Sequence, residues 1–160
     1  MSAAARGWRR AAMVGTAVVA MDQVTKAAVM ASLEPGETIP IVTGLRLTYV
    51  RNTGVAFGAL ADSRLPVALL AGAAMLGLLV FFGFNAHRPR LWLPVGLLLG
   101  GAVGNLADRA RLGAVIDFID PVAWPAFNLA DSFIVIGIAA MVLVAHHEER
   151  DEPASRPTAT

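Results

Sequence analysis

The apolar segments LPVALLAGAAMLGLLVFFGF (residues 65–84) and LWLPVGLLLGGAVGNLA (residues 91–107) decide the fold of this chain. Neither contains a charged side chain, and each approaches the roughly 20 residues that an α-helix needs to cross a bilayer. Two further apolar segments, at about residues 11–31 and 128–145, flank this pair. The pattern therefore predicts four transmembrane helices.

The composition is that of a small integral membrane protein. The 160 residues are 56% hydrophobic and 16% charged, with a mean hydropathy of +0.62, which is too apolar for an ordinary soluble domain. The absence of cysteine excludes disulfides, thiolate metal sites and cysteine nucleophiles. A net charge of +1 with scattered arginines gives no reason to expect nucleic acid. We expect a monomer among membrane lipids that uses no cofactor.

Basic residues predict the orientation in the membrane. They precede the first helix, fill the loop between the second and third, and follow the fourth: Arg6, Arg9, Arg10, Arg88, Arg90 and Arg150. The positive-inside rule then places both termini in the cytoplasm and the two longer loops outside. The basic start followed by an apolar run resembles a secretory signal. However, the apolar stretch continues to about Ala31 and three more spans follow, which favours an uncleaved helix.

Outside the helices, the sequence predicts one small β element and one disordered tail. Leu45, Leu47 and Tyr49 alternate with polar residues, which is the pattern of a half-buried strand. Residues 147–160 are polar and rich in charge and proline, so a disordered cytoplasmic tail is expected after a membrane domain of residues 1–146. The predicted fold is an all-α membrane protein with four transmembrane helices and a small extracytoplasmic β element.

Asp117 and Asp131 are the candidate catalytic residues. Both are predicted at the outer membrane boundary, Asp117 in a loop and Asp131 at the start of the fourth helix. A carboxylate near hydrocarbon is costly and therefore points to function. If the two meet, they share one proton, and such a pair can hydrolyse an amide without a metal. The three histidines, at positions 87, 146 and 147, lie on the predicted cytoplasmic side, so no histidine triad or histidine zinc site is expected at the outer face.

Other polar residues in the helices have two interpretations each. Asp22 and Lys26 are spaced i, i+4, so they are either a buried ion pair that holds the bundle together or part of the site. Asn105, Asp108 and Arg109 lie on one face at the end of the third helix, either as an interfacial cap or in contact with substrate.

Two further features complete the pattern in the helices. Gly96, Gly100 and Gly104 form a small-residue face that indicates close helix packing. Asn128, one turn before Asp131, is placed to orient a carboxylate or the substrate backbone.

Five ordered motifs resemble those of bacterial lipoprotein signal peptidase, or signal peptidase II, an aspartyl peptidase family: DQVTK (residues 22–26), NTGVAF (residues 52–57), GGAVGNLADR (residues 100–109), VIDFI (residues 115–119) and FNLAD (residues 127–131). The resemblance implies an aspartyl endopeptidase of the bacterial inner membrane. Its substrate would be a lipidated prolipoprotein, cut just before the diacylglyceryl-modified cysteine near the outer face. One departure is Val55, where many relatives have alanine.

The same resemblance implies roles for individual residues. Asp117 and Asp131 would be the catalytic pair, and no metal would be bound. The supporting or substrate-binding positions would be Asp22, Lys26, Asn52, Gly54, Asn105, Asp108, Arg109, Asn128 and Ala130.

Two alternatives come from other functional classes. A proton- or cation-coupled carrier would use Asp22, Asp117 and Asp131 as a relay, since intramembrane carboxylates also mark ion pathways. A relay should thread acids through the depth of the membrane, whereas only Asp22 lies deep here. A non-catalytic scaffold would need neither Asp117 nor Asp131 for any turnover.

Overall fold

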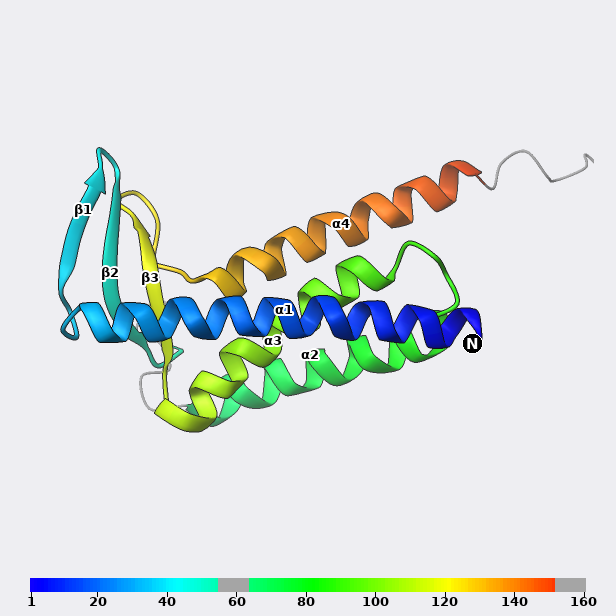
Figure 1. The fold of residues 1–160 in the computed structure, drawn as a ribbon, viewed down its shortest axis with the longest axis horizontal. Helices are drawn as coiled ribbons and strands as arrows, with labels where there is room; N and C mark the ends of the chain where they lie inside the picture. Colours follow the sequence, from blue (N-terminus) through cyan, green and yellow to red (C-terminus); the bar gives the residue numbers. More distant parts are fainter. Residues whose placement is uncertain (55–63, 152–160) are drawn as a thin grey trace, which may run out of the picture.

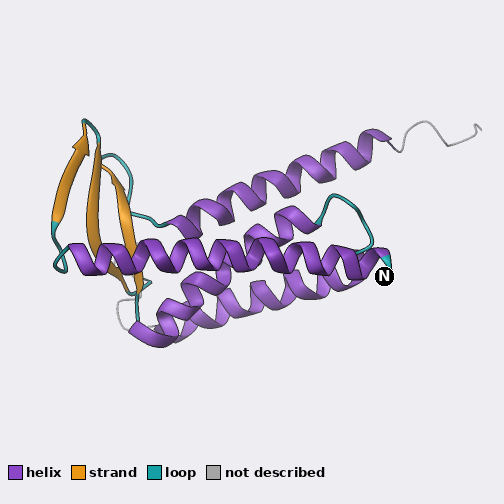
Figure 2. Ribbon diagram, in the orientation of Figure 1, coloured by secondary structure: helices purple, strands orange, loops and turns teal. Residues whose placement is uncertain are grey.

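The computed structural model describes residues 1–54 and 64–151, which form four α-helices and one three-stranded antiparallel sheet. Figure 1 and Figure 2 show the sheet at one end of the helices and the N-terminus at the other. The elements are α1 (Ala3–Ser32), β1 (Thr38–Val42), β2 (Leu45–Asn52), α2 (Arg64–Asn85), α3 (Trp92–Leu112), β3 (Val115–Pro121) and α4 (Leu129–Asp151). The predicted four helices and small β element are thus confirmed, while Val55 and residues 152–160 lie outside the described residues.

The helices extend beyond their apolar segments. Helix α1 begins at Ala3 rather than near residue 11, because the Ser2 side chain caps it by accepting from the Ala5 N–H at 3.1 Å. Helix α4 continues to Asp151, so the first residues of the expected tail are helical. Within the described residues, Leu129–Glu148 is long and apolar enough to cross a membrane, and Leu69–Asn85 is a shorter apolar helix. Hydropathy locates the apolar part of a helix, and caps decide where it ends.

The small-residue face of α3 packs closely against two other helices, as the sequence predicts. A Cβ added at Gly96 would lie 2.8 Å from the Ala11 carbonyl oxygen of α1. One added at Gly101 would lie 2.6 Å from the Ala130 carbonyl oxygen of α4. Any side chain at these positions would push α1 or α4 away, so the glycines set the distances between the helices that carry the polar residues.

The sheet contains strands from both of the loops that the sequence predicts on the outer side of the membrane. Strand β2 pairs antiparallel with β1 and with β3, and it contains the predicted strand around Leu45 to Tyr49. The prediction of a loop around Asp117 is wrong, because Asp117 lies in strand β3. Residues 115–118 are all buried, so the strand has no alternation of polar and apolar residues to mark it.

Two turns return the chain from α3 to α4. Gly113 adopts a left-handed conformation, with φ of 71°, and its N–H donates to the Arg109 carbonyl at 3.1 Å, which ends α3. After β3 the chain folds back, and Phe127 pairs with Ile119 through hydrogen bonds of 2.8 and 2.9 Å. Helix α4 therefore starts beside β3.

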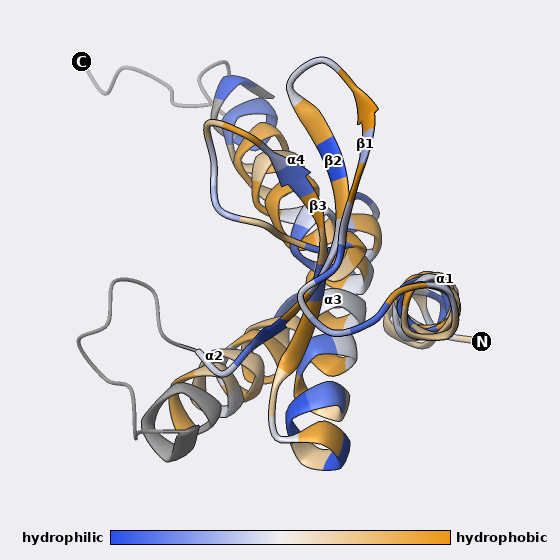
Figure 3. Ribbon diagram, turned by 90° about the vertical axis from the view of Figure 1, so that its left-hand side faces the viewer, coloured by the Kyte–Doolittle hydropathy of each residue, from blue (hydrophilic) through white to orange (hydrophobic). Residues whose placement is uncertain are grey.

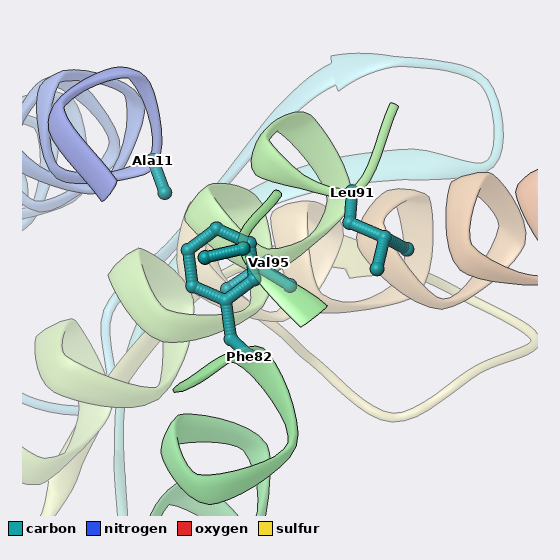
Figure 4. Close-up of a cluster of buried hydrophobic side chains, with 5 residues drawn as sticks. Ala11, Phe82, Leu91 and Val95 are labelled. Atoms are coloured by element: carbon teal, nitrogen blue, oxygen red, sulfur yellow. The ribbon is translucent and has the colours of Figure 1, made fainter. Parts of the chain in front are cut away.

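Two apolar clusters lie at the two ends of the bundle. One joins α1 to the sheet and comprises Val29, Leu33, Tyr49, Ile116 and Phe118. The other, which Figure 4 shows in part, joins α1, α2 and α3 at the opposite end and comprises Ala11, Phe82, Ala86, Leu91 and Val95. Figure 3 shows hydrophobic turns along most of the helices and hydrophilic turns at the ends of α3 and α4. The polar residues of the site lie next to the sheet-side cluster.

Candidate active site

Asp117 and Asp131 belong to one hydrogen-bond network, in which Asn128 joins them. The Asn128 Nδ2 donates to Asp117 Oδ1 at 2.7 Å, and the Asn128 backbone N–H donates to Asp131 Oδ2 at 3.2 Å. Asn128 is fully buried and Asp117 is 2% exposed. The structure thus brings the two aspartates against the same residue, which the sequence alone did not establish.

Asp131 is held by the first turn of α4. The Asn128 Oδ1 accepts from the Asp131 N–H at 2.9 Å, so the two residues form a reciprocal capping box at the start of the helix. The backbone N–H of the preceding residue, Ala130, donates to Asp22 Oδ1 of α1 at 3.0 Å.

Asp117 is held by the sheet. Asn52 of β2 pairs with Val115 of β3, which places Asn52 diagonally across from Asp117 on the same face. The Asn52 Nδ2 donates to Asp117 Oδ2 at 2.8 Å. The Asn52 Oδ1 accepts from the Gly54 N–H at 2.9 Å, and Gly54 has a φ of 96° that favours glycine. Gly54 therefore helps to fix the orientation of the Asn52 side chain.

Three asparagines orient the two carboxylates in the same manner. In each, the amide oxygen accepts from a fixed donor and the amide nitrogen donates to an aspartate. For Asn105 the fixed donor is Lys26 Nζ at 3.0 Å, and its Nδ2 donates to Asp131 Oδ1 at 2.7 Å. Every carboxylate oxygen of Asp117 and Asp131 thus accepts at least one hydrogen bond.

Burial raises the pKa of Asp117 from its ordinary value of 3.8 to about 6. The hydrogen bond from Asn52 lowers this pKa, the negative charge of Asp131 raises it, and Asn128 and Lys26 lower it further. Burial is the largest of these effects. Asp117 therefore exchanges its proton in the range where a general acid or base is effective near neutral pH.

Lys26 forms a buried ion network directly behind the asparagines. Its Nζ lies 2.8 Å from Asp22 Oδ2 and 2.7 Å from Asp108 Oδ2, and it is 1% exposed. Asp22 and Lys26 thus form the buried ion pair that their i, i+4 spacing predicts, and the same Lys26 Nζ also contacts Asn105 of the site. A Cβ at Gly104 would lie 2.6 Å from Asp22 Oδ2, so glycine leaves the space for this carboxylate.

Asp108 is paired with neighbours other than Arg109. It accepts from Gln23 Nε2 at 3.1 Å and from Arg111 Nη2 at 3.3 Å, in addition to its contact with Lys26. Gln23 also accepts a hydrogen bond from Arg111. Arg109 is half-buried and donates to the Asn105 carbonyl at 3.5 Å.

Sequence reasoning missed Gln23 and Arg111 as members of the network. Gln23 was recognisable as the neighbour of Asp22 within the first motif, and Arg111 as the residue three positions after Asp108. Neither position predicts the contact between α1 and α3 that joins them.

An apolar cavity of about 400 Å³ adjoins Asp131. Asp131 is a charged residue of its wall, and the wall otherwise comes from the segment before α4 and from one face of α4: Trp124, Phe127, Ser132, Val135 and Ile136. Among residues 1–54 and 64–151, no three acidic or histidine side chains are grouped so as to hold a metal ion. The site thus has one carboxylate, Asp131, at the edge of an apolar space and a second, Asp117, buried behind Asn128.

Comparison with known proteins gives the family. The model of the family described as Signal peptidase (SPase) II matches residues 14–146. The chain belongs to this family. The lipoprotein signal peptidase of Halothermothrix orenii is 40% identical over 134 residues, covering 83% of this chain and 92% of that protein. The lipoprotein signal peptidase of Pelotomaculum thermopropionicum is 45% identical over 122 residues, covering 75% and 80%.

Solved structures agree with this signal peptidase II fold. A bacterial membrane enzyme determined by the in meso method superposes with a TM-score of 0.80 at 27% identity, covering 92% of this chain and 94% of the other. A second such structure gives a TM-score of 0.77 at 30% identity, covering 84% and 91%. The chain is therefore a membrane peptidase, and the alternative of a coupled carrier has no support.

Replacing Asn52 by alanine is expected to lower the cleavage rate by roughly 10- to 100-fold, because a lost hydrogen bond to a charged group in a desolvated site costs about 1–3 kcal/mol. The same range is expected for Asn128→Ala, which also removes the helix cap. Steady-state kinetics on purified variants measures both. Normal rates in both variants would mean that Asn52 serves only as a turn residue and Asn128 only as a helix cap.

Lys26→Met is expected to lower kcat by about 10- to 100-fold and to raise the pKa that Asp117 contributes to the rate. It removes the donor that fixes Asn105, and it removes a positive charge that lowers the Asp117 pKa. The pH dependence of kcat/KM separates this from a loss of stability alone. An unchanged profile would mean that Lys26 serves only the packing of α1 on α3.

Proposed function

We propose that Asp117 and Asp131 are the catalytic pair of this lipoprotein signal peptidase. The observation that carries the proposal is the shared contact with Asn128, which joins the buried Asp117 to Asp131 in the wall of the apolar cavity. The substrate is a prolipoprotein with a diacylglyceryl-modified cysteine, and the bond cleaved is the one before that cysteine. The enzyme acts as a monomer.

The dyad hydrolyses the amide with one proton between its two carboxyl groups. The ionised member takes a proton from the attacking water, and the protonated member donates to the carbonyl oxygen under attack. Asp117 is the more buried of the two and burial raises its pKa, so it keeps the shared proton, while Asp131 acts as the base. The proton that Asp131 takes up then passes to the leaving amine as the C–N bond breaks, and the hydroxyl that Asp117 protonated returns its proton to Asp117 as the carbonyl re-forms.

The other candidate residues support the pair at two levels. Asn52, Asn105 and Asn128 hydrogen-bond the carboxylates directly. The remaining positions hold these asparagines or the start of α4 in place: Asp22, Lys26, Gly54, Asp108 and Ala130. Arg109, half-buried at the end of α3, is the candidate for direct contact with substrate.

In the proposed topology all four helices cross the inner membrane, both termini are cytoplasmic and the sheet is extracytoplasmic. Large apolar side chains on α2 and α4 support this because they face outward: Leu70 is 74%, Phe84 79% and Val135 65% exposed. The basic residues Arg6 and Arg88 lie at the end of the bundle opposite the sheet, as the positive-inside rule requires for a cytoplasmic end.

The apolar cavity next to Asp131 supports a lipid-anchored substrate. Its walls of Trp124, Phe127, Val135 and Ile136 suit the apolar groups that flank the cleaved bond. A substrate held by two acyl chains would enter at the depth of the start of α4. The proposal therefore expects lipidated prolipoproteins to be cleaved in preference to unlipidated peptides.

The pH dependence of cleavage tests the dyad. Asp117 has its pKa raised to about 6, so the shared proton is lost as the pH rises through that value, and kcat/KM is expected to fall above about pH 6. At acid pH the rate falls again, because the pair of carboxyl groups takes up a second proton and no base remains. EDTA is expected to leave the rate unchanged. If EDTA inhibits cleavage and a divalent cation restores it, the two aspartates act as ligands of a metal and not as a metal-free catalytic pair.

A further inference from the structure

A second polar cavity lies at the end of the bundle opposite the active site. It has a volume of about 180 Å³ and lies between α1 and the loop that joins α2 to α3. Four basic side chains and one indole ring line it: Arg6, Arg10, His87, Arg88 and Trp92. Figure 1 places the start of α1 and this loop at the same end of the molecule. None of these residues takes part in the aspartate network.

The walls of this cavity, the basic cavity, are fixed by close contacts. A Cβ added at Gly7 would lie 2.2 Å from the Ala86 carbonyl oxygen, so only glycine allows α1 to touch the loop here. The Arg10 guanidinium stacks over Trp92, 5.7 Å from the ring centroid. The apolar cluster in Figure 4, which includes Phe82 and Leu91, packs at the same end of the bundle. The basic side chains therefore surround a preformed space.

The charges in the basic cavity are unbalanced. Arg6 and Arg10 are one helical turn apart, and like charges at this spacing repel each other. Arg6 Nη1 donates to the Met1 carbonyl oxygen at 2.7 Å, and among the described residues neither guanidinium group has a carboxylate partner. Glu148 of α4 pairs with Arg88 at 2.9 Å. Helix α3 begins at this cavity with Trp92, and no side chain caps its first turn. An anion with several oxygens matches both the guanidinium groups and the positive end of α3.

The surroundings indicate that this anion is part of a lipid. Phe84, at the end of α2, is 79% exposed, and Leu93, in the first turn of α3, is 41% exposed. Both residues lie within two positions of residues that line the cavity, Ala86 and Trp92, so a lipid whose phosphate occupies the cavity would have apolar protein surface near its acyl chains. The basic start of a signal peptide would be repelled by Arg6 and Arg10. Basic pockets between helices at the cytoplasmic boundary suit acidic lipid headgroups.

We propose that the basic cavity binds the phosphodiester headgroup of an anionic phospholipid of the inner leaflet. The inference rests on the topology proposed above, in which this end of the bundle is cytoplasmic. It does not depend on the assignment of the aspartates. Bound lipid would tie the start of α1 to the loop between α2 and α3, at the opposite end of α1 from Lys26.

Lipid binding to the purified full-length chain tests the proposal. The protein in neutral detergent is titrated with phosphatidylglycerol or phosphatidylcholine of identical acyl chains, and bound lipid is counted by native mass spectrometry. We expect phosphatidylglycerol to bind at least about tenfold more tightly. In Arg6→Gln/Arg10→Gln this affinity should fall about 25-fold, because each basic residue near a membrane surface contributes about fivefold.

The matched control is Arg9→Gln/Arg150→Gln, which removes two positive charges from the same end of the bundle but none from the wall of the basic cavity. Its affinity should change by less than about threefold. An equal loss in both double variants would show diffuse surface attraction and overturn the proposal. Equal binding of the two lipids, or displacement of the lipid by inorganic phosphate at equal concentration, would overturn it as well.

Two further variants keep the test decisive if the double variant does not fold. Arg10→Gln alone should lose about fivefold in affinity for phosphatidylglycerol, and Arg6→Lys/Arg10→Lys should stay within about threefold of wild type, because it keeps both charges. Failure of either expectation would contradict a charge-specific site. The measurement is of lipid binding and not of cleavage, so its failure leaves the peptidase proposal standing, and the reverse also holds.

Discussion

Replacing Asp117 or Asp131 by asparagine is expected to abolish cleavage, with a loss of roughly three powers of ten or more in kcat. General acid and base catalysis each contribute about 10²- to 10⁴-fold, and an amide can neither take a proton from water nor donate one as a carboxylic acid does. Because the two groups act as one unit, the double variant should be no slower than either single variant. Single-turnover cleavage of a lipidated prolipoprotein measures all three.

The folded state should survive these substitutions. Burial raises the pKa of Asp117 above its ordinary value, so ionising it opposes folding, and the free energy of unfolding falls as the pH rises from about 4 to about 6. An asparagine at position 117 carries no charge and avoids this cost. The variant should therefore insert in the membrane and unfold near the wild-type temperature, which separates lost chemistry from lost structure.

Asp120 provides the matched control within the same strand. It lies three residues after Asp117 in β3 and pairs with Arg46, whose Nη2 is 2.7 Å away and whose side chain is 43% exposed. An exposed ion pair contributes at most about 1 kcal/mol, so Asp120→Asn should retain most of the activity. Near-normal turnover in Asp117→Asn or Asp131→Asn would show that the two aspartates are not the catalytic pair.

The second large effect concerns the lipid on the substrate. A prolipoprotein without diacylglycerol, or with its modified cysteine replaced by serine, is expected to be cleaved roughly 100-fold more slowly or not at all. Each buried methylene contributes about 0.8 kcal/mol, and two chains hold the substrate stably at the membrane boundary where α4 begins. Both forms should be compared at matched concentration in detergent micelles. Equal cleavage of the two forms would mean that the enzyme does not recognise the lipid on its substrate.

The helices could be predicted from the sequence because each contains an apolar run near the length of a membrane span. Their ends could not, because Ser2 caps α1 upstream of its apolar run and polar residues extend α4 to Asp151. Strand β3 was missed because all of residues 115–118 are buried, which removes the alternation that marks a strand. Burial on both faces is a tertiary property that a local pattern does not contain.

The members of the site could be predicted better than their contacts. The motifs include Asp117, Asp131 and the three asparagines, and the i, i+4 spacing indicated the ion pair of Asp22 with Lys26. The contact of Lys26 with Asn105 joins residues 79 positions apart, and that of Asn52 with Asp117 joins residues 65 apart. These pairs depend on the glycine face of α3 and on the register of β2 with β3.

Mass spectrometry of the products, after purified enzyme is incubated with a diacylglyceryl-modified prolipoprotein, shows which bond is cut and whether Asp117 and Asp131 are needed to cut it. We expect a product that begins with the lipidated cysteine, formed by the wild type and by Asp120→Asn but absent with Asp117→Asn or Asp131→Asn. A product that begins elsewhere, or the same product from either dyad variant, would contradict this expectation.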